Sequence, residues 1–89
     1  MDRIERIRAA LEAALSPETL DIVDESHLHI GHAGARTGLG HFRVHIRSDA
    51  FAGVNPLARH RMVYEALGDM MTTDIHALSI RAEATGGGA

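Results

Sequence analysis

The sequence predicts an α+β domain with the order helix, strand, strand, helix, strand, in which both helices cover one face of a small mixed three-stranded sheet. Apolar residues recur at steps of three and four in residues 2–15 and again in residues 56–71, which is the period of a helix. In residues 40–48 apolar and polar side chains alternate, as in a strand buried on one face. Because 89 residues have room for one core, we expect a single domain over residues 1–85 and a flexible tail at 86–89.

The first half of the chain contributes a helix, a strand and a long loop. The apolar face of the helix consists of Ile4, Ile7, Leu11, Ala14 and Leu15. Pro17 ends this helix because proline disfavours the helical conformation in the residue before it. The segment LDIVDES, residues 20–26, is typical of a strand. Residues 27–40 contain four of the nine glycines and little apolar periodicity, which predicts a loop.

The second half contributes two strands and the helix that connects them. In the strand at 40–48 we expect Phe42, Val44 and Ile46 to face the core, and His41, Arg43, His45 and Arg47 to face solvent. Asn55 is suited to cap the second helix, and Pro56 to begin it. The buried stripe of that helix is expected to comprise Leu57, His60, Val63, Tyr64, Leu67, Met70 and Met71. A last strand is expected at 75–84, with room for a short extra helical turn before it.

Composition and charge narrow the classes of function. The chain has no cysteine, so it forms no disulfide, and a metal must be held by imidazole, by carboxylate or by the sulfur of a partner. Its formal net charge of −3 argues against a strongly basic nucleic-acid binder. The apolar runs are too short to span a membrane, and we expect a cytoplasmic protein.

Three histidines lie close together in the segment ESHLHIGHAG, residues 25–34. Imidazole is the commonest metal ligand in proteins, so this spacing is compatible with a metal site. Three loop histidines also occur simply as solvated side chains. A zinc hydrolase would be poorly preorganised on such a glycine-rich loop. The other motifs of common enzymes are absent, and we therefore expect no enzymatic activity.

A local basic surface is the alternative that the arginines leave open. Arg43 lies on the outer face of its strand, and Arg59 and Arg61 lie on the second helix. Side chains at these three positions could contact phosphates, although residues two apart on a helix point about 200° away from each other. We therefore expect one of the two helical arginines to pack against the protein or to pair with an acid.

Five segments together resemble the BolA family over residues 4–83. They are VDESHLH at 23–29, HFRVHIRS at 41–48, the Phe and Gly at 51 and 53, RHRMVYEAL at 59–67 and IHAL at 75–78. The resemblance implies a fold similar to class II KH domains. The glycine motif with which KH domains grip nucleic acid is missing between the second helix and the last strand; the GHAG at 31–34 lies elsewhere in the fold.

The resemblance implies two activities. One is partnership with a monothiol glutaredoxin in holding a 2Fe-2S cluster, for which His76 of IHAL and His29 of the loop match the family's ligand positions, with His32 as a substitute. The partner's cysteine and glutathione would supply the thiolates, so the isolated protein is expected to hold no cofactor. The other is transcriptional regulation of the stress response and cell morphology. For this activity the arginine pattern described above, and not the resemblance, supplies the candidate DNA contacts Arg43, Arg59 and Arg61.

Overall fold

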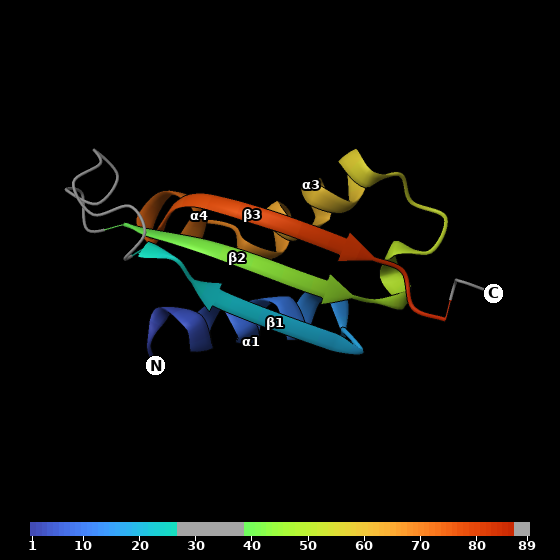
Figure 1. Cartoon of the computed structure of the whole chain (residues 1–89), viewed down its shortest axis with the longest axis horizontal. Helices are drawn as coiled ribbons and strands as arrows, with labels where there is room; N and C mark the ends of the chain where they lie inside the picture. Colours follow the sequence, from blue (N-terminus) through green and yellow to red (C-terminus); the bar gives the residue numbers. More distant parts are fainter. Residues whose placement is uncertain (27–38, 87–89) are drawn as a thin grey trace.

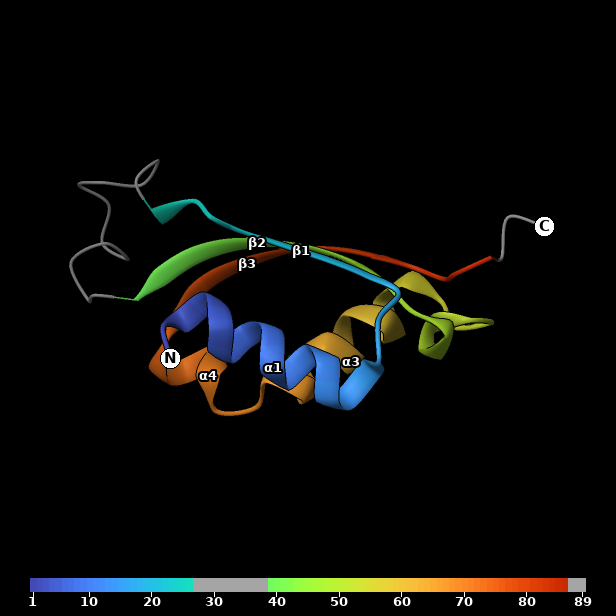
Figure 2. The same ribbon diagram turned by 90° about the horizontal axis from the view of Figure 1, so that it is seen from below.

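A computed structural model of the chain describes residues 1–26 and 39–86. Its elements are α1 (Arg3–Leu15), β1 (Thr19–Asp24), β2 (Gly40–Arg47), the 3₁₀ turn η2 (Asp49–Phe51), α3 (Pro56–Leu67), α4 (Met70–Thr73) and β3 (Ile75–Glu83). The helices α1, α3 and α4 all lie on one side of the sheet (Figure 2), and no helix of the described residues lies on its other face. The predicted α+β fold with helices on one face is therefore confirmed.

The sheet has the strand order β1-β2-β3. The strands β1 and β2 are antiparallel, with Thr19 opposite Arg47, whereas β2 and β3 are parallel. The predicted mixed sheet is thus confirmed. One consequence of this topology is visible in Figure 1: β1 ends, and β2 and β3 begin, at the same end of the sheet.

Both long helices begin at a side-chain cap, and the cap of the second helix is the predicted Asn55. The Asp2 side chain accepts a hydrogen bond from the Glu5 amide, 2.8 Å away, and so caps α1. The Asn55 side chain accepts from the Ala58 amide at 2.9 Å and caps α3. These caps satisfy amides that have no partner within the helix, and they fix where each helix starts.

The predicted helix at 56–71 is wrong in its last four residues, where it is not continuous. The helix α3 ends at Leu67, where Gly68 takes φ of 54° and its amide donates to the Tyr64 carbonyl. Glycine adopts a positive φ at little steric cost, so it commonly stops a helix at this point. The separate helix α4 follows at Met70–Thr73, and the expected extra helical turn before the last strand is confirmed.

The core lies between the sheet and the helices. Its buried members are Ile7, Leu11 and Leu15 of α1, Phe42, Val44 and Ile46 of β2, Phe51, Val63 and Leu67 of the crossover, and Ile75 of β3. Two residues placed on the buried stripe by periodicity are exposed instead, Leu57 to 64% and Tyr64 to 41%. They lie on the flank of α3 that turns away from Val63 and Leu67, through which this helix packs. Ala14 is also exposed, because α1 packs through its other apolar positions.

Candidate metal-ligand site

His76 is the extra residue in a β-bulge at the start of β3. Gly40 pairs with Ile75 and the next residue, His41, pairs with Ala77, so His76 has no partner in β2. The bulge changes which side chains face the core. Ile75 is buried, His76 and Ala77 are both exposed, and the alternation then resumes with Leu78 half-buried against the core.

His41 is the imidazole that the structure brings to His76. The centroids of the two rings are 5.0 Å apart and their planes are tilted by 47°. We expected His41 to be solvated, and this prediction is wrong, because the residue is only 8% exposed. Sequence reasoning missed it since its surroundings depend on a register shift in a strand more than thirty residues away.

Main-chain hydrogen bonds hold the start of β2 in place beside His76. The Gly40 amide donates to the Asp74 carbonyl at 2.9 Å, and the Glu25 amide donates to the His41 carbonyl at 2.7 Å. The His41 amide donates to Ser26 Oγ at 3.0 Å. The start of β2 is therefore tied on one side to the end of β1 and on the other to the start of β3.

Asp74, two residues before His76, carries the strongest electrostatic cluster at this end of the sheet. Its Oδ1 accepts hydrogen bonds from Arg6 Nη2 at 2.5 Å and from Arg3 Nε at 3.4 Å, and its Oδ2 accepts from Thr73 Oγ1 at 2.9 Å. The hydrogen bond from Thr73, followed by the interactions with Arg6 and Arg3, lowers the pKa of the Asp74 carboxyl, against the opposing effect of burial. The side chain thus stays ionised and joins α1 to the start of β3.

His29 and His32, the two predicted loop ligands, lie outside the described residues. The residues that flank this loop, Ser26 and Leu39, lie at the end of the sheet where His76 lies. Within 1–26 and 39–86 no group of three histidine, aspartate or glutamate side chains is arranged to hold a metal ion. In this part of the chain the two imidazoles that lie in ring contact are those of His41 and His76.

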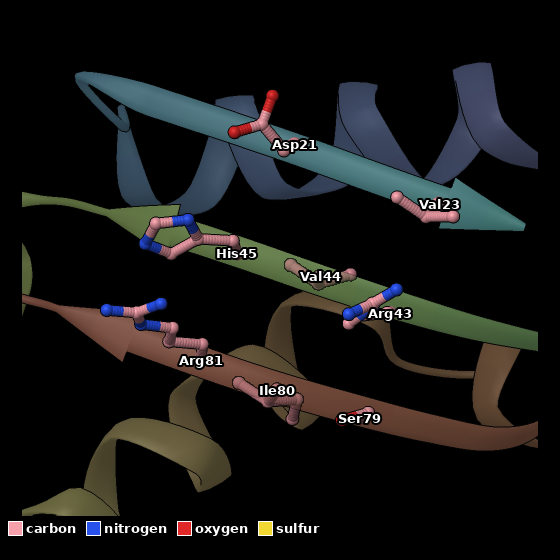
Figure 3. A pocket seen from close by; sticks show the side chains of 8 residues that line it. All are labelled: Asp21, Val23, Arg43, Val44, His45, Ser79, Ile80 and Arg81. Carbon is pink, nitrogen blue, oxygen red and sulfur yellow. The ribbon is translucent and has the colours of Figure 1, made fainter.

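The open face of the sheet carries a shallow hollow of about 370 Å³ farther along the strands. Asp21, Val23, Arg43, Val44, His45, Ser79, Ile80 and Arg81 line it (Figure 3). Its cationic side chains already have acidic partners: Arg43 pairs with Glu25 at 2.8 Å and Arg81 with Glu83 at 3.5 Å. The hollow is therefore close to neutral and is not a strong anion site.

His45 lies on the open face of the sheet as expected, but it is not simply solvated. The residue is half-buried, and its Nε2 lies 2.5 Å from Glu83 Oε1. This hydrogen bond is the main cause that lowers the pKa of Glu83, and the charges of Arg81 and Arg47 act in the same direction. The contact joins neighbouring strands and gives His45 a structural partner.

The three predicted DNA-contacting arginines have different surroundings. The Arg59 guanidinium donates to the Val54 carbonyl at 2.7 Å and to the Ala82 carbonyl at 3.1 Å, so it ties the start of α3 to the end of β3. Arg61 is exposed on the other side of α3. Arg43 is 58% exposed at its side chain despite its ion pair. Arg61 is thus the freest of the three to meet an external phosphate.

Among the described helices, none combines the length and the apolar character needed to cross a bilayer.

Comparison with known proteins gives a consistent set of relatives. The profile of the family described as BolA-like protein matches residues 11–86. BolA-like protein 1 of Mus musculus is 49% identical over 77 residues, which are 86% of this chain and 54% of that protein. The DNA-binding transcriptional regulator BolA of Escherichia coli is 43% identical over 76 residues, 85% of this chain and 70% of that protein. The chain thus spans about half the length of the mouse relative.

Solved structures give the same likeness in three dimensions. The BolA domain of SufE1 from Arabidopsis thaliana superposes with a TM-score of 0.84 at 41% identity, covering 96% of this chain and 94% of that one. BolA1 from the same plant superposes with a TM-score of 0.81 at 40% identity, covering 94% of this chain and 93% of that one.

Proposed function

Because the chain belongs to the BolA-like protein family, we propose that it is an adaptor that binds a monothiol glutaredoxin and shares a 2Fe-2S cluster with it in the cytoplasm. The cluster would be held between the two proteins for iron-sulfur trafficking or for iron and redox signalling. The proposal concerns a binding protein and requires no catalytic residue.

The observation that carries the proposal is the exposed His76 at its bulge. A bulge re-aims a side chain, and here it presents an imidazole at the end of the sheet that a partner can reach. The His41 ring lies 5.0 Å from it, so imidazole is the donor type available. Histidine replaces cysteine on one iron of some 2Fe-2S clusters, so this donor set fits half of such a cluster.

We assign the ligand roles to His76 and to His29, with His32 as the substitute. The absence of cysteine from the chain supports a shared site, because the remaining ligands must then be thiolates of the glutaredoxin and of glutathione. When bound, the cluster would supply electron-transfer and iron-delivery chemistry. The isolated chain would hold no cofactor.

The test is co-expression with a monothiol glutaredoxin, followed by visible absorption and circular dichroism of the purified complex. The wild-type pair should show the bands of a 2Fe-2S cluster, and the His29→Ala, His76→Ala double variant should lose or change them. His60→Gln is the matched control, since His60 lies half-buried on α3, on the covered face of the sheet. An unchanged spectrum in the double variant would show that the ligand assignment is wrong.

Two single variants identify which imidazole acts together with His76. If His29 is the second ligand, His29→Ala should alter the spectrum and His41→Asn should leave its band positions in place. The reverse result would transfer the role to His41, the ring that lies 5.0 Å from His76.

A second candidate function is DNA binding. It is favoured by the name of the Escherichia coli relative, a DNA-binding transcriptional regulator, and by the exposure of Arg61 on α3. Mobility shifts with competitor DNA at two salt concentrations test it. If Arg61 contacts a phosphate, Arg61→Gln should reduce the slope of log affinity against log salt by about one. Binding that disappears with competitor DNA would count against this function.

A further inference from the structure

We propose that Asp74 is a positioning residue for His76, and that its carboxylate, held by two arginines of α1, fixes the direction in which the His76 ring leaves the sheet. This inference deepens the proposed function, and only its consequence for the cluster rests on that function. The orientation of His76 in the partner-free protein is a separate, measurable property.

The first support is the environment of the Asp74 side chain. The residue is only 7% exposed, yet it carries a charge, so it needs close partners. Arg6 supplies the shortest contact, at 2.5 Å, and Arg3 a longer one, at 3.4 Å. Thr73 satisfies the other carboxylate oxygen. A buried carboxylate with three side-chain donors has little freedom to move.

The second support is the main chain of the same residue. The Asp74 amide donates to the Met70 carbonyl at 3.0 Å, and the Asp74 carbonyl accepts from the Gly40 amide at 2.9 Å. Asp74 is therefore the point at which α1, α4, β2 and β3 meet. Its side-chain contacts come from α1 and from Thr73 of α4, and its main-chain contacts come from α4 and β2.

The third support is the position of His76 relative to this junction. Ile75, which lies between Asp74 and His76, is 1% exposed and pairs with Gly40. Ala77, which follows His76, pairs with His41. The bulged His76 is the only residue between these two fixed points. Because a bulge has no ladder partner of its own, its orientation depends on how firmly its neighbours are held. The Asp74 contacts with α1 add a charged restraint on the preceding side.

The partner-free test is nuclear magnetic resonance of the histidine rings and the amides. In the wild type, ring protons of His41 and His76 should give a nuclear Overhauser contact, as their centroids are 5.0 Å apart. Asp74→Asn removes the charge while keeping the size. It should weaken this contact and speed hydrogen exchange of the Gly40 amide by about tenfold, the effect expected when a charge-assisted hydrogen bond is lost. Arg6→Gln should do the same, and Arg6→Lys should restore part of it.

Arg8→Gln is the matched control. Arg8 lies on the same helix and donates to the Leu20 carbonyl of β1 at 3.2 Å, so its loss weakens the attachment of α1 without touching the start of β3. It should lower the unfolding temperature but leave the His41–His76 contact and the Gly40 exchange rate unchanged. If Arg8→Gln changes these readouts as much as Asp74→Asn, or if Asp74→Asn leaves both unchanged, the positioning role is refuted.

The consequence for the cluster is tested in the complex with glutaredoxin. If the wild-type pair holds a cluster, Asp74→Asn should release it several-fold faster while Arg8→Gln releases it at the wild-type rate; equal rates in all three proteins would refute the functional consequence. If the wild-type pair holds no cluster, the proposed function fails, and the resonance experiment still decides whether Asp74 positions His76.

Discussion

Replacing Gly40 by alanine should destabilise the protein through one steric contact. An alanine Cβ at this position would lie 2.3 Å from Cε2 and 2.6 Å from Cζ of Phe42, and 3.2 Å from Ser26 Oγ. The Phe42 ring cannot easily yield, because it is 2% exposed within the core. The backbone cannot easily yield either, since Gly40 is hydrogen-bonded to the start of β3.

Two opposing effects set the magnitude. Overpacking a core costs about 1–3 kcal/mol, whereas exchanging glycine for alanine at a compatible site gains about 0.4–1 kcal/mol by reducing the entropy of the unfolded chain. The clash involves two atoms of a buried aromatic ring, so we expect it to dominate, with a net loss of about 1–2 kcal/mol. For a domain of this size that loss lowers the unfolding temperature by roughly 4–16 °C.

Thermal unfolding followed by far-ultraviolet circular dichroism measures this loss, and a double-mutant cycle tests its cause. Leucine at position 42 lacks the two ring atoms that clash, so Gly40→Ala should cost less in a Phe42→Leu background than in the wild type. An equal cost in both backgrounds, or a Gly40→Ala variant as stable as the wild type, would refute the steric argument.

Two further predictions concern stability. Ser48 is 1% exposed and its Oγ donates to the Leu15 carbonyl at 2.5 Å, so Ser48→Ala should lower the free energy of unfolding by about 1–3 kcal/mol in urea titrations. The control Ser79→Ala, at an exposed serine, should change this free energy by less than about 0.5 kcal/mol. Equal effects of the two substitutions would contradict the role of the Ser48 hydrogen bond. The carboxyl groups of Asp74 and Glu83 both have pKa values lowered from 3.8 and 4.5 respectively, so the folded state binds their protons less readily than the unfolded state does. The two carboxylates contribute fully to the free energy of unfolding above their ordinary pKa values. This contribution is lost as the pH falls through the lowered pKa values of the folded state. The urea midpoint should therefore fall on acidification below about pH 4.5, and less steeply in the Asp74→Asn, Glu83→Gln double variant; identical pH profiles would contradict this assignment.

The sequence predicted those parts of the fold that depend on local pattern. The alternation of Phe42, Val44 and Ile46 predicted a strand with one buried face, and all three are in the core. The predicted cap Asn55 does start its helix, because capping is a property of a few adjacent residues. The mixed order of the sheet also followed, since a helical crossover favours a parallel pair.

Most of the failures share one physical cause, which is dependence on contacts between distant segments; the length of the helix at 56–71 is the exception, because Gly68 is a local stop signal. The helix at 56–71 was predicted too long because apolar residues continue past Gly68, whereas a positive φ there ends the helix. The predictions for Leu57 and Tyr64 were wrong because helical periodicity does not say how wide a face the sheet covers. His41 and His45 were misjudged because each meets a side chain from β3, namely His76 and Glu83.

For the candidate site, the sequence indicated which residue types could act as ligands, and the structure shows which residues lie next to His76. The resemblance selected His76, and the structure adds His41 beside it and Asp74 before it. The assignments of His29 and His32 stay predictions, because both residues lie outside the described ranges. Arg59 was one of the three arginines predicted to contact DNA. In the structure its two hydrogen bonds to main-chain carbonyls give it a role in the fold.

The bulge at His76 also bears on which insertions and deletions β3 can accept. Removing one residue from a regular strand exchanges the two faces of everything beyond the deletion. Removing His76 would instead join Ile75 to Ala77 in the register that Gly40 and His41 already impose, and residues 78–83 would keep their present faces. A chain of this fold could therefore gain or lose the proposed ligand by a single-codon change without rebuilding its core.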